Sequence, residues 1–247
     1  MKRREISYSP PDITDAEINE VVDALKSGWI TTGPKTKELE RLVAERCGVS
    51  KAVCLNSNTA CAEMTLRIMG VGPGDEVIVP AYTYTASASV VEHVGAKLVL
   101  IDCEPGKFTW DYDKVEAAIN EKTKAIIPVD LFGIPADYDR LFDIVERKRS
   151  LFHISQNRPE GQPMDTELWG ASIQKAIGRV VIVADAAHSF GATYKGRHIG
   201  SVADFTSFSL LGVKKLTTRR PESLENRHFS RLSFSNFGPA SVYQFAA

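Results

Sequence analysis

The sequence predicts an α/β protein whose core is a mainly parallel, doubly wound sheet, and two observations support this prediction. Short apolar runs typical of buried strands alternate with segments whose apolar residues repeat at helical spacing. Small polar and acidic residues directly follow several of the expected strands. Ligands in such folds bind beyond the carboxyl ends of the strands. The residues expected at that edge are Asn58, Tyr84, Asp130 and Asp185.

Composition limits the classes of protein and partner. The 247 residues are 43% hydrophobic and 25% charged, which is enough for one large domain or one and a half. A formal net charge of -1 without a basic block predicts no nucleic-acid partner. No run approaches the roughly 18 apolar residues of a membrane span, so we expect no membrane contact. The charged N-terminus lacks the apolar segment of a signal peptide, which predicts a cytoplasmic protein.

Two helices are expected before the first strand. Thr14 and Glu17 have the spacing of a capping box, and the helix that they begin should end near Gly28. A loop rich in glycine, threonine and proline follows. It leads into a second helix, whose inner face carries Leu39 and Leu42.

The remaining elements alternate in type. The expected strands are 52–55, 76–80, 97–102, 125–130, 180–185 and 205–209. The expected helices are 56–69, one that begins after Tyr84, 111–121, 137–149 and 168–177. Residues 150–167 break the pattern and predict an insertion or exposed loop.

Two parts of this pattern point to chemistry. The segment from Asn58 to Ala60 follows a strand and begins a helix, so its free backbone N–H groups and the Thr59 hydroxyl can bind an anion. Asp185 ends a strand, and Lys214 and Lys215 follow a later one. An acid and an amine so placed suit pyridoxal phosphate (PLP), which needs a protonated ring nitrogen and a covalent anchor. Taken alone, Asp185 would more often be a helix cap and Lys214 a surface lysine.

Other chemistries have less support. The glycine-rich run 70–74 follows a helix and precedes a strand, which is the wrong order for a dinucleotide fingerprint and disfavours a nucleotide-sugar dehydrogenase. His93 and His153 lack metal-ligand neighbours, and Ser189 is outside a nucleophile elbow, so we expect no metal site and no acyl transfer. The cysteines are expected to be buried free thiols: Cys47, Cys54, Cys61 and Cys103.

Five motifs in order resemble the DegT/DnrJ/EryC1/StrS family of PLP-dependent sugar aminotransferases. They are GWITTGPKTKELE, GDEVIVPAYTYTASA, PVDLFGIPADYD, VADAAHSFGATYKG and ADFTSFSLLGVKKLTT. The resemblance covers about residues 5–218 except 150–167. It implies the aspartate aminotransferase-like fold (fold type I) and divides the chain into an N-terminal arm and helix (1–30), a PLP-binding large domain (31–218) and an atypical tail (219–247).

The resemblance also implies a role for each matching residue. Lys214 matches the lysine that holds PLP covalently and moves protons during the reaction. Asp185 matches the acid that pairs with the pyridine nitrogen, and His188 a residue near the phenolic oxygen. Tyr84 matches the aromatic residue that stacks on the ring. The residues that match the phosphate cradle are Asn58, Thr59, Ala60 and Ser209.

The sequence also departs from the family pattern. Leu210 and Leu211 replace an aromatic residue and a histidine, and residues 219–247 have no counterpart of the C-terminal small domain. The resemblance implies a homodimer that moves an amino group from an amino acid, L-glutamate, to a nucleotide-linked keto-sugar. The alternative is a catalytically silent, truncated remnant or an interaction partner of an intact paralogue.

Overall fold

The computed structural model describes residues 13–155, 157, 169–210 and 241–245. The helices are α1 (Asp15–Ser27), α2 (Pro34–Cys47), α3 (Asn58–Ile68), α4 (Thr85–His93), α5 (Tyr112–Ala118), α6 (Tyr138–Arg147) and α7 (Trp169–Ile177), with short 3₁₀ turns η1 (Leu131–Gly133) and η2 (Arg149–Leu151). The strands are β1 (Lys51–Leu55), β2 (Glu76–Pro80), β3 (Lys97–Ile101), β4 (Thr123–Ile126), β5 (Val181–Asp185), β6 (Thr193–Tyr194), β7 (Arg197–His198), β8 (Phe205–Ser207) and β9 (Ser241–Phe245).

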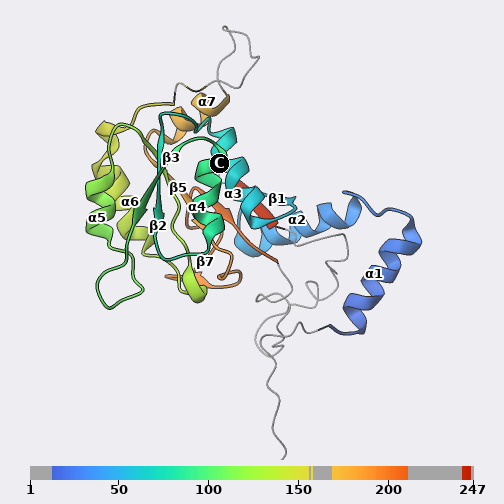
Figure 1. Cartoon of the computed structure of the whole chain (residues 1–247). Helices are drawn as coiled ribbons and strands as arrows, with labels where there is room; N and C mark the ends of the chain where they lie inside the picture. The colour runs from blue at the N-terminus through green and yellow to red at the C-terminus, as the bar shows by residue number, and fades with distance from the viewer. Residues whose placement is uncertain (1–12, 156, 158–168, 211–240, 246–247) are drawn as a thin grey trace, which may run out of the picture.

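Seven of these strands form one sheet between two layers of helices, while β6 and β7 pair in a separate two-stranded sheet (Figure 1). The strand order is β1-β9-β8-β5-β4-β2-β3, and the pairs β5/β8, β4/β5, β2/β4 and β2/β3 are parallel. β9 runs antiparallel to both of its neighbours. The described sheet is therefore mainly parallel, as the alternation of strands and helices predicted.

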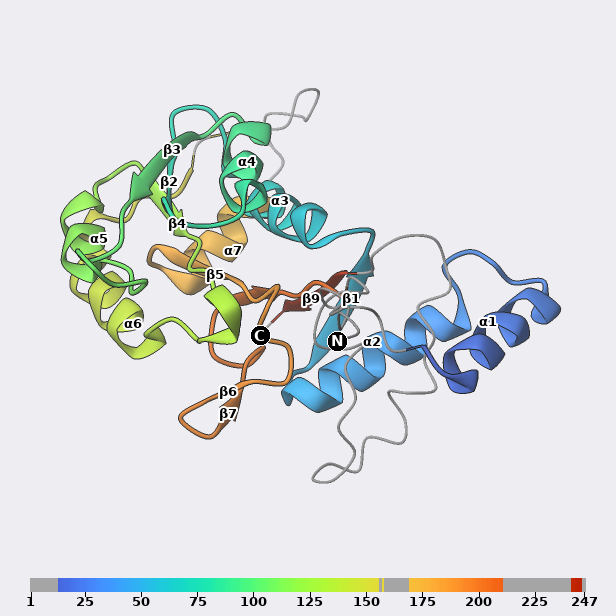
Figure 2. The same cartoon turned by 60° about the horizontal axis from the view of Figure 1, so that its bottom comes forward.

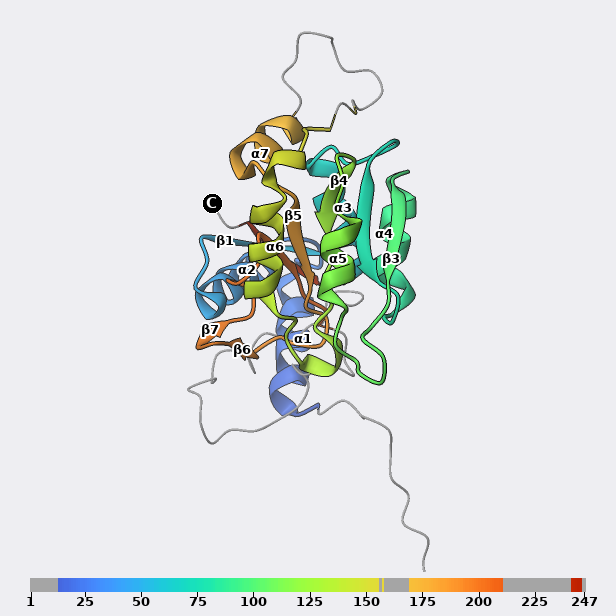
Figure 3. The ribbon, with the colours of Figure 1, turned by 90° about the vertical axis from the view of Figure 1, so that its left-hand side faces the viewer.

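Alternate residues of the central strands point to opposite faces of the sheet, which is why both faces carry helices. Ile78, Ile126 and Ile182 pack with residues of α2, α5 and α6. Their neighbours Val77 and Val181 pack with residues of α3, α4 and α7. Helices α5 and α6 lie side by side on the first face (Figure 3).

The N-terminal helices follow the predicted signals. Thr14 caps α1, because its hydroxyl accepts a hydrogen bond from Ala16 N (3.2 Å) while Glu17 accepts from Thr14 N (2.7 Å). Gly28 ends α1 in the left-handed conformation (φ 70°), which glycine adopts without strain. α1 lies beyond the end of α2, away from the sheet (Figure 2).

The structure differs from the prediction at β9. The sequence pattern predicted no strand in the tail 219–247, yet Ser241–Phe245 pairs with β1 and β8 inside the sheet. The sequence pattern missed this strand because the segment has no clear alternation of apolar and polar residues. The division of the chain at residues 30 and 218 stays a prediction.

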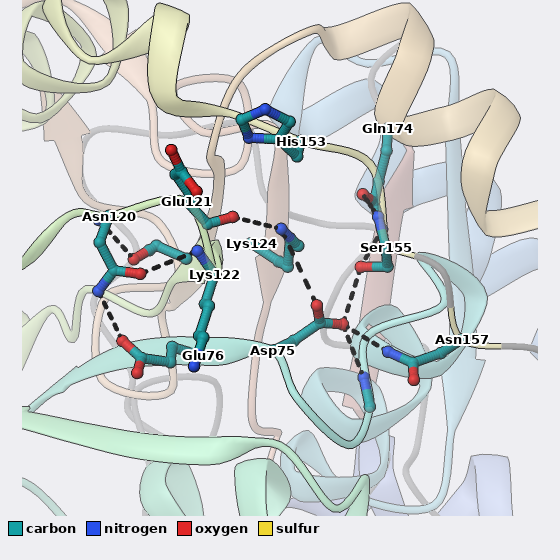
Figure 4. Close-up of polar contacts among 12 residues, drawn as sticks. Asp75, Glu76, Asn120, Glu121, Lys122, Lys124, His153, Ser155, Asn157 and Gln174 are labelled. Carbon is teal, nitrogen blue, oxygen red and sulfur yellow. Dashed lines mark hydrogen bonds and ion pairs between the residues drawn. The ribbon is translucent and has the colours of Figure 1, made fainter.

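The start of the segment 150–167, predicted to be an insertion or exposed loop, is not exposed throughout. Ser155 is only 4% exposed, and its hydroxyl donates to Asp75 Oδ2 (2.8 Å). Asn157 donates to the same oxygen (2.7 Å), while Gln174 of α7 accepts from Ser155 N (2.9 Å). Buried Asp75 therefore ties this segment to the amino ends of β2 and β4 (Figure 4).

Smaller differences affect element ends. The helix expected over 111–121 ends at Ala118, and the strand expected over 205–209 ends at Ser207. All four cysteines are free, as predicted, but only Cys47 and Cys61 are buried. Burial raises the pKa of the Cys47 thiol to about 12, which keeps it protonated and unreactive.

Candidate active site

Asp185 occupies the centre of the predicted ligand-binding edge. It is the last residue of β5, in the middle of the sheet, and is 7% exposed. Its backbone N–H donates to Pro128 O (2.8 Å), and its carbonyl accepts from Asp130 N (3.0 Å). These bonds continue the pairing of the chain after β4 with β5 and hold the Asp185 backbone in place.

Three donors converge on the Asp185 carboxylate. Asn58 Nδ2 and Ala187 N donate to Oδ1 (2.7 and 3.2 Å), and the Ser87 hydroxyl donates to Oδ2 (2.7 Å). An ionised carboxylate offers about four acceptor sites, so one site is left for a ligand. The three donors come from α3, α4 and the turn after β5, and the carboxylate is therefore the point where these elements meet.

The first turn of α3 contains the predicted anion site. Ser57 caps the helix by accepting from Ala60 N at its hydroxyl (3.0 Å). Thr59 lies in the same turn, where backbone N–H groups have no intrahelical partner and the helix dipole attracts an anion. Asn58 begins this helix but directs its side-chain amide at Asp185. The anion site and the acid are therefore adjacent.

Tyr84 is the N-cap residue of α4 and is 78% exposed. An aromatic residue that served only the core would be buried. The exposed ring of Tyr84 is therefore available to contact a ligand. Its carbonyl accepts from Ser87 N (3.2 Å), and the hydroxyl of the same serine donates to Asp185. Tyr84 and Asp185 are thereby held in one local framework.

The other predicted residues follow β5 and β8. His188 is half-buried in the turn after β5. Ser207 pairs with Asp185 across the parallel strands, and Ser209 lies two residues further on, 9% exposed. Lys214 and its neighbour Lys215 lie outside the described residues. Their predicted roles, like those of the other site residues, stay predictions.

Ser87 and the role of Asp130 were missed by the sequence analysis. The Asp130 side chain is fully buried and accepts from Tyr138 Oη (2.8 Å), Ala136 N (3.0 Å) and the Ser189 hydroxyl (2.6 Å). Burial raises the pKa of Asp130, and the hydrogen bonds oppose this shift only in part. Asp130 thus fixes the turn that carries His188. In the sequence, the one indication of a role for Asp130 was its place at the end of the expected strand 125–130.

Two properties of the described residues bear on the kind of site. No helix there has the length and apolar character that a membrane span requires. Within those ranges, no group of three or more His, Cys, Asp or Glu side chains is arranged to hold a metal ion.

The mainly parallel sheet, with Asp185 at its carboxyl edge beside the N-terminus of α3, defines an α/β protein with a candidate ligand site at that edge. The chain belongs to the DegT/DnrJ/EryC1/StrS aminotransferase family, whose sequence profile matches residues 11–153 and 160–220. The resemblance drawn from the motifs is thus confirmed.

Individual relatives agree with this assignment. The chain is 36% identical over 214 residues to GDP-perosamine synthase of Caulobacter vibrioides, a match that covers 86% of this chain and 50% of the relative. It is 35% identical over 208 residues to the UDP-4-amino-4-deoxy-L-arabinose--oxoglutarate aminotransferase of Shewanella sediminis, which covers 84% and 46%.

Among solved structures, the PLP form of the putative sugar aminotransferase Spr1654 from Streptococcus pneumoniae has 50% sequence identity and a TM-score of 0.81. That alignment covers 99% of this chain and 54% of the other. The chain therefore spans about half the length of the relatives that it matches.

Proposed function

We propose that this chain binds PLP at the carboxyl edge of its sheet and takes part in moving an amino group from an amino acid to a keto group of a nucleotide-linked sugar. The observation that carries the proposal is the buried Asp185, held by three donors with one acceptor site left, beside the N-terminus of α3. A protein that binds PLP needs an acidic side chain at the ring nitrogen and an anion site for the phosphate.

Three features of the described residues support the fit to PLP. The remaining acceptor site of Asp185 suits a protonated pyridine nitrogen. The first turn of α3, with the Thr59 hydroxyl, suits a phosphate. Tyr84 offers an exposed ring for stacking. When bound, PLP supplies an acceptor for the amino group and an electron sink for the substrate carbon.

The chain's own residues then divide the work. Asp185 would accept a hydrogen bond from the pyridine nitrogen, and Thr59 and Ser209 would contact the phosphate. Of the other two residues predicted for the phosphate cradle, Asn58 directs its amide at Asp185 and Ala60 donates its N–H to the Ser57 hydroxyl. His188 would lie near the phenolic oxygen of the ring. Lys214 would hold PLP covalently and would act as the general base and acid that moves protons during amino transfer.

The substrate classes come from the names of the relatives. One is a synthase of a GDP-linked amino sugar and another an oxoglutarate aminotransferase of a UDP-linked amino sugar. Nucleotide-linked keto-sugars therefore suit as acceptors, and L-glutamate suits as the donor because it yields oxoglutarate. A homodimer in the cytoplasm completes the proposal.

The experiment is to incubate the purified chain with PLP, record the visible absorption band and reduce the complex with borohydride before peptide mapping. We expect the label on Lys214. Lys214→Ala should remove both label and band, while the matched control Lys215→Ala should keep both. A nucleotide-linked keto-sugar and L-glutamate should then give oxoglutarate.

A wild-type chain without band or label would contradict the proposal and favour the silent remnant. A label that moves to Lys215 would contradict the assignment of Lys214.

A further inference from the structure

The Asp185 carboxylate joins side chains that are far apart in the sequence. Asn58 lies 127 residues before it, at the start of α3, and Ser87 lies 98 residues before it, on α4. Both donor distances are 2.7 Å, and Ser87 is only 2% exposed. The contact of Ser87 with Asp185 is therefore buried, and that of Asn58 is partly buried.

The chemistry of the Asn58 amide fixes its orientation. Its nitrogen must face Asp185, because an amide oxygen at that distance would oppose the carboxylate oxygen with no proton between them. The other amide atom, Asn58 Oδ1, is then buried and has no hydrogen-bond partner among the described residues. Asn58 is thus committed to donating to Asp185 despite an unsatisfied oxygen.

Ser87 is committed in the same way. Its hydroxyl carries one hydrogen, and an ionised carboxylate can only accept, so that hydrogen goes to Asp185 Oδ2. The Thr83 hydroxyl lies 3.2 Å from Ser87 Oγ and must therefore donate to it. This gives a chain of donors from Thr83 through Ser87 to Asp185, in which each bond polarises the next.

We propose that Asn58 and Ser87 are positioning residues that orient the Asp185 carboxylate, so that its one remaining acceptor site faces the pyridine nitrogen of PLP. This inference rests on the proposed function, since it presumes that PLP occupies the site. A proton shared between a carboxylate and a pyridine stays on the nitrogen when other donors stabilise the carboxylate charge. Without those donors, the proton moves toward the carboxyl group and the ring becomes a weaker electron sink.

The test uses PLP labelled with ¹⁵N at the ring nitrogen, whose NMR shift reports protonation directly. In the wild-type chain we expect the protonated value. Ser87→Ala, which removes one oxygen, should move the shift toward the neutral value and raise the Kd for PLP about tenfold, the lower end of what supporting hydrogen bonds contribute at metal sites. Ser87→Thr keeps the hydroxyl and should restore both values.

Asn58→Ala should act in the same direction, and the double variant should show the larger shift. The matched control is Ser89→Ala, on the same helix as Ser87 but bonded to Thr85 O. It should keep the wild-type shift. Thermal melting checks that each variant folds. If Asn58→Ala does not fold, Ser87→Ala by itself tests the proposal.

The outcomes separate the two proposals. If the wild-type chain binds PLP and the shift is unchanged in both Ser87→Ala and Asn58→Ala, the positioning role is wrong while the proposed function stands. If the wild-type chain binds no PLP, both are wrong.

Discussion

Asp185 and Asp75 are buried carboxylates at opposite ends of the sheet, and they differ in what surrounds them. Asp75, at the amino end of β2, accepts from Gly72 N, Ser155 Oγ and Asn157 Nδ2, and Lys124 Nζ lies 3.9 Å from its other oxygen (Figure 4). Its neighbours satisfy it with hydrogen bonds and a cation.

Asp185 is satisfied differently. Its donors are neutral, one acceptor site is left, and the N-termini of α3 and α4 lie beside it. Burial of a carboxylate is therefore not by itself a sign of function. The absence of a cation from the described donors to Asp185, and its position at the carboxyl edge of the sheet, distinguish the candidate site from the structural cluster at Asp75.

The largest expected effect is on the candidate site. Asp185→Asn keeps the shape but places an amide where the pyridine nitrogen needs an anion. We expect the rate of amino transfer to fall on the order of 10²- to 10³-fold, as when a preorganised charge interaction is lost in other enzymes. Steady-state kinetics with a keto-sugar and L-glutamate measure this. If Asp185→Asn keeps an activity within threefold of the wild type, Asp185 has no larger role in amino transfer than Asp75.

Asp75→Ala should give the complementary result. It leaves Lys124 buried without its counter-ion and removes the acceptor of Ser155 and Asn157. We expect the free energy of unfolding to fall by about 3 kcal/mol, the lower end for breaking a buried pair, because the ion pair is long. Urea denaturation measures this, and the Kd for PLP should stay unchanged. A selective loss of PLP affinity would contradict the structural role.

The third prediction concerns pH and Asp130. Burial raises its pKa in the folded chain, so between about pH 4 and that raised value the folded state binds more protons than the unfolded state. This group therefore makes the wild-type chain less stable as pH rises through that window. Asp130→Asn should show a weaker decline in urea midpoint from pH 4 to pH 7. An equal decline in both proteins would place the titrating group elsewhere.

The smallest expected effect is at the start of α3. Ser57→Ala removes the acceptor of Ala60 N and should destabilise the chain by about 1 kcal/mol, as for other N-caps. Thermal or urea denaturation measures this change. Thr14→Ala removes the corresponding cap of α1, which lies away from the sheet, and is the matched control. Only Ser57→Ala should also weaken PLP binding, and equal Kd values in both variants would argue against the phosphate site.

Local patterns in the sequence were sufficient for much of the fold and for the positions of Asn58 and Asp185 in it. The alternation of apolar runs with helical spacing predicted the parallel sheet, and the capping box predicted the start of α1. Asn58 and Asp185 were placed at the correct edge because parallel strands end together. These features depend on residues close in the chain, where periodicity and caps act.

Tertiary packing decided the rest. The pairing of β9 within the sheet, the burial of Ser155 against Asp75, and the meeting of Asn58 and Ser87 on Asp185 all join segments distant in sequence. No local pattern specifies such contacts, because the partner of a polar side chain depends on which helices the folded sheet brings together. In an extended chain, the side chains of Ser155, Asn58 and Ser87 could all form hydrogen bonds with water instead.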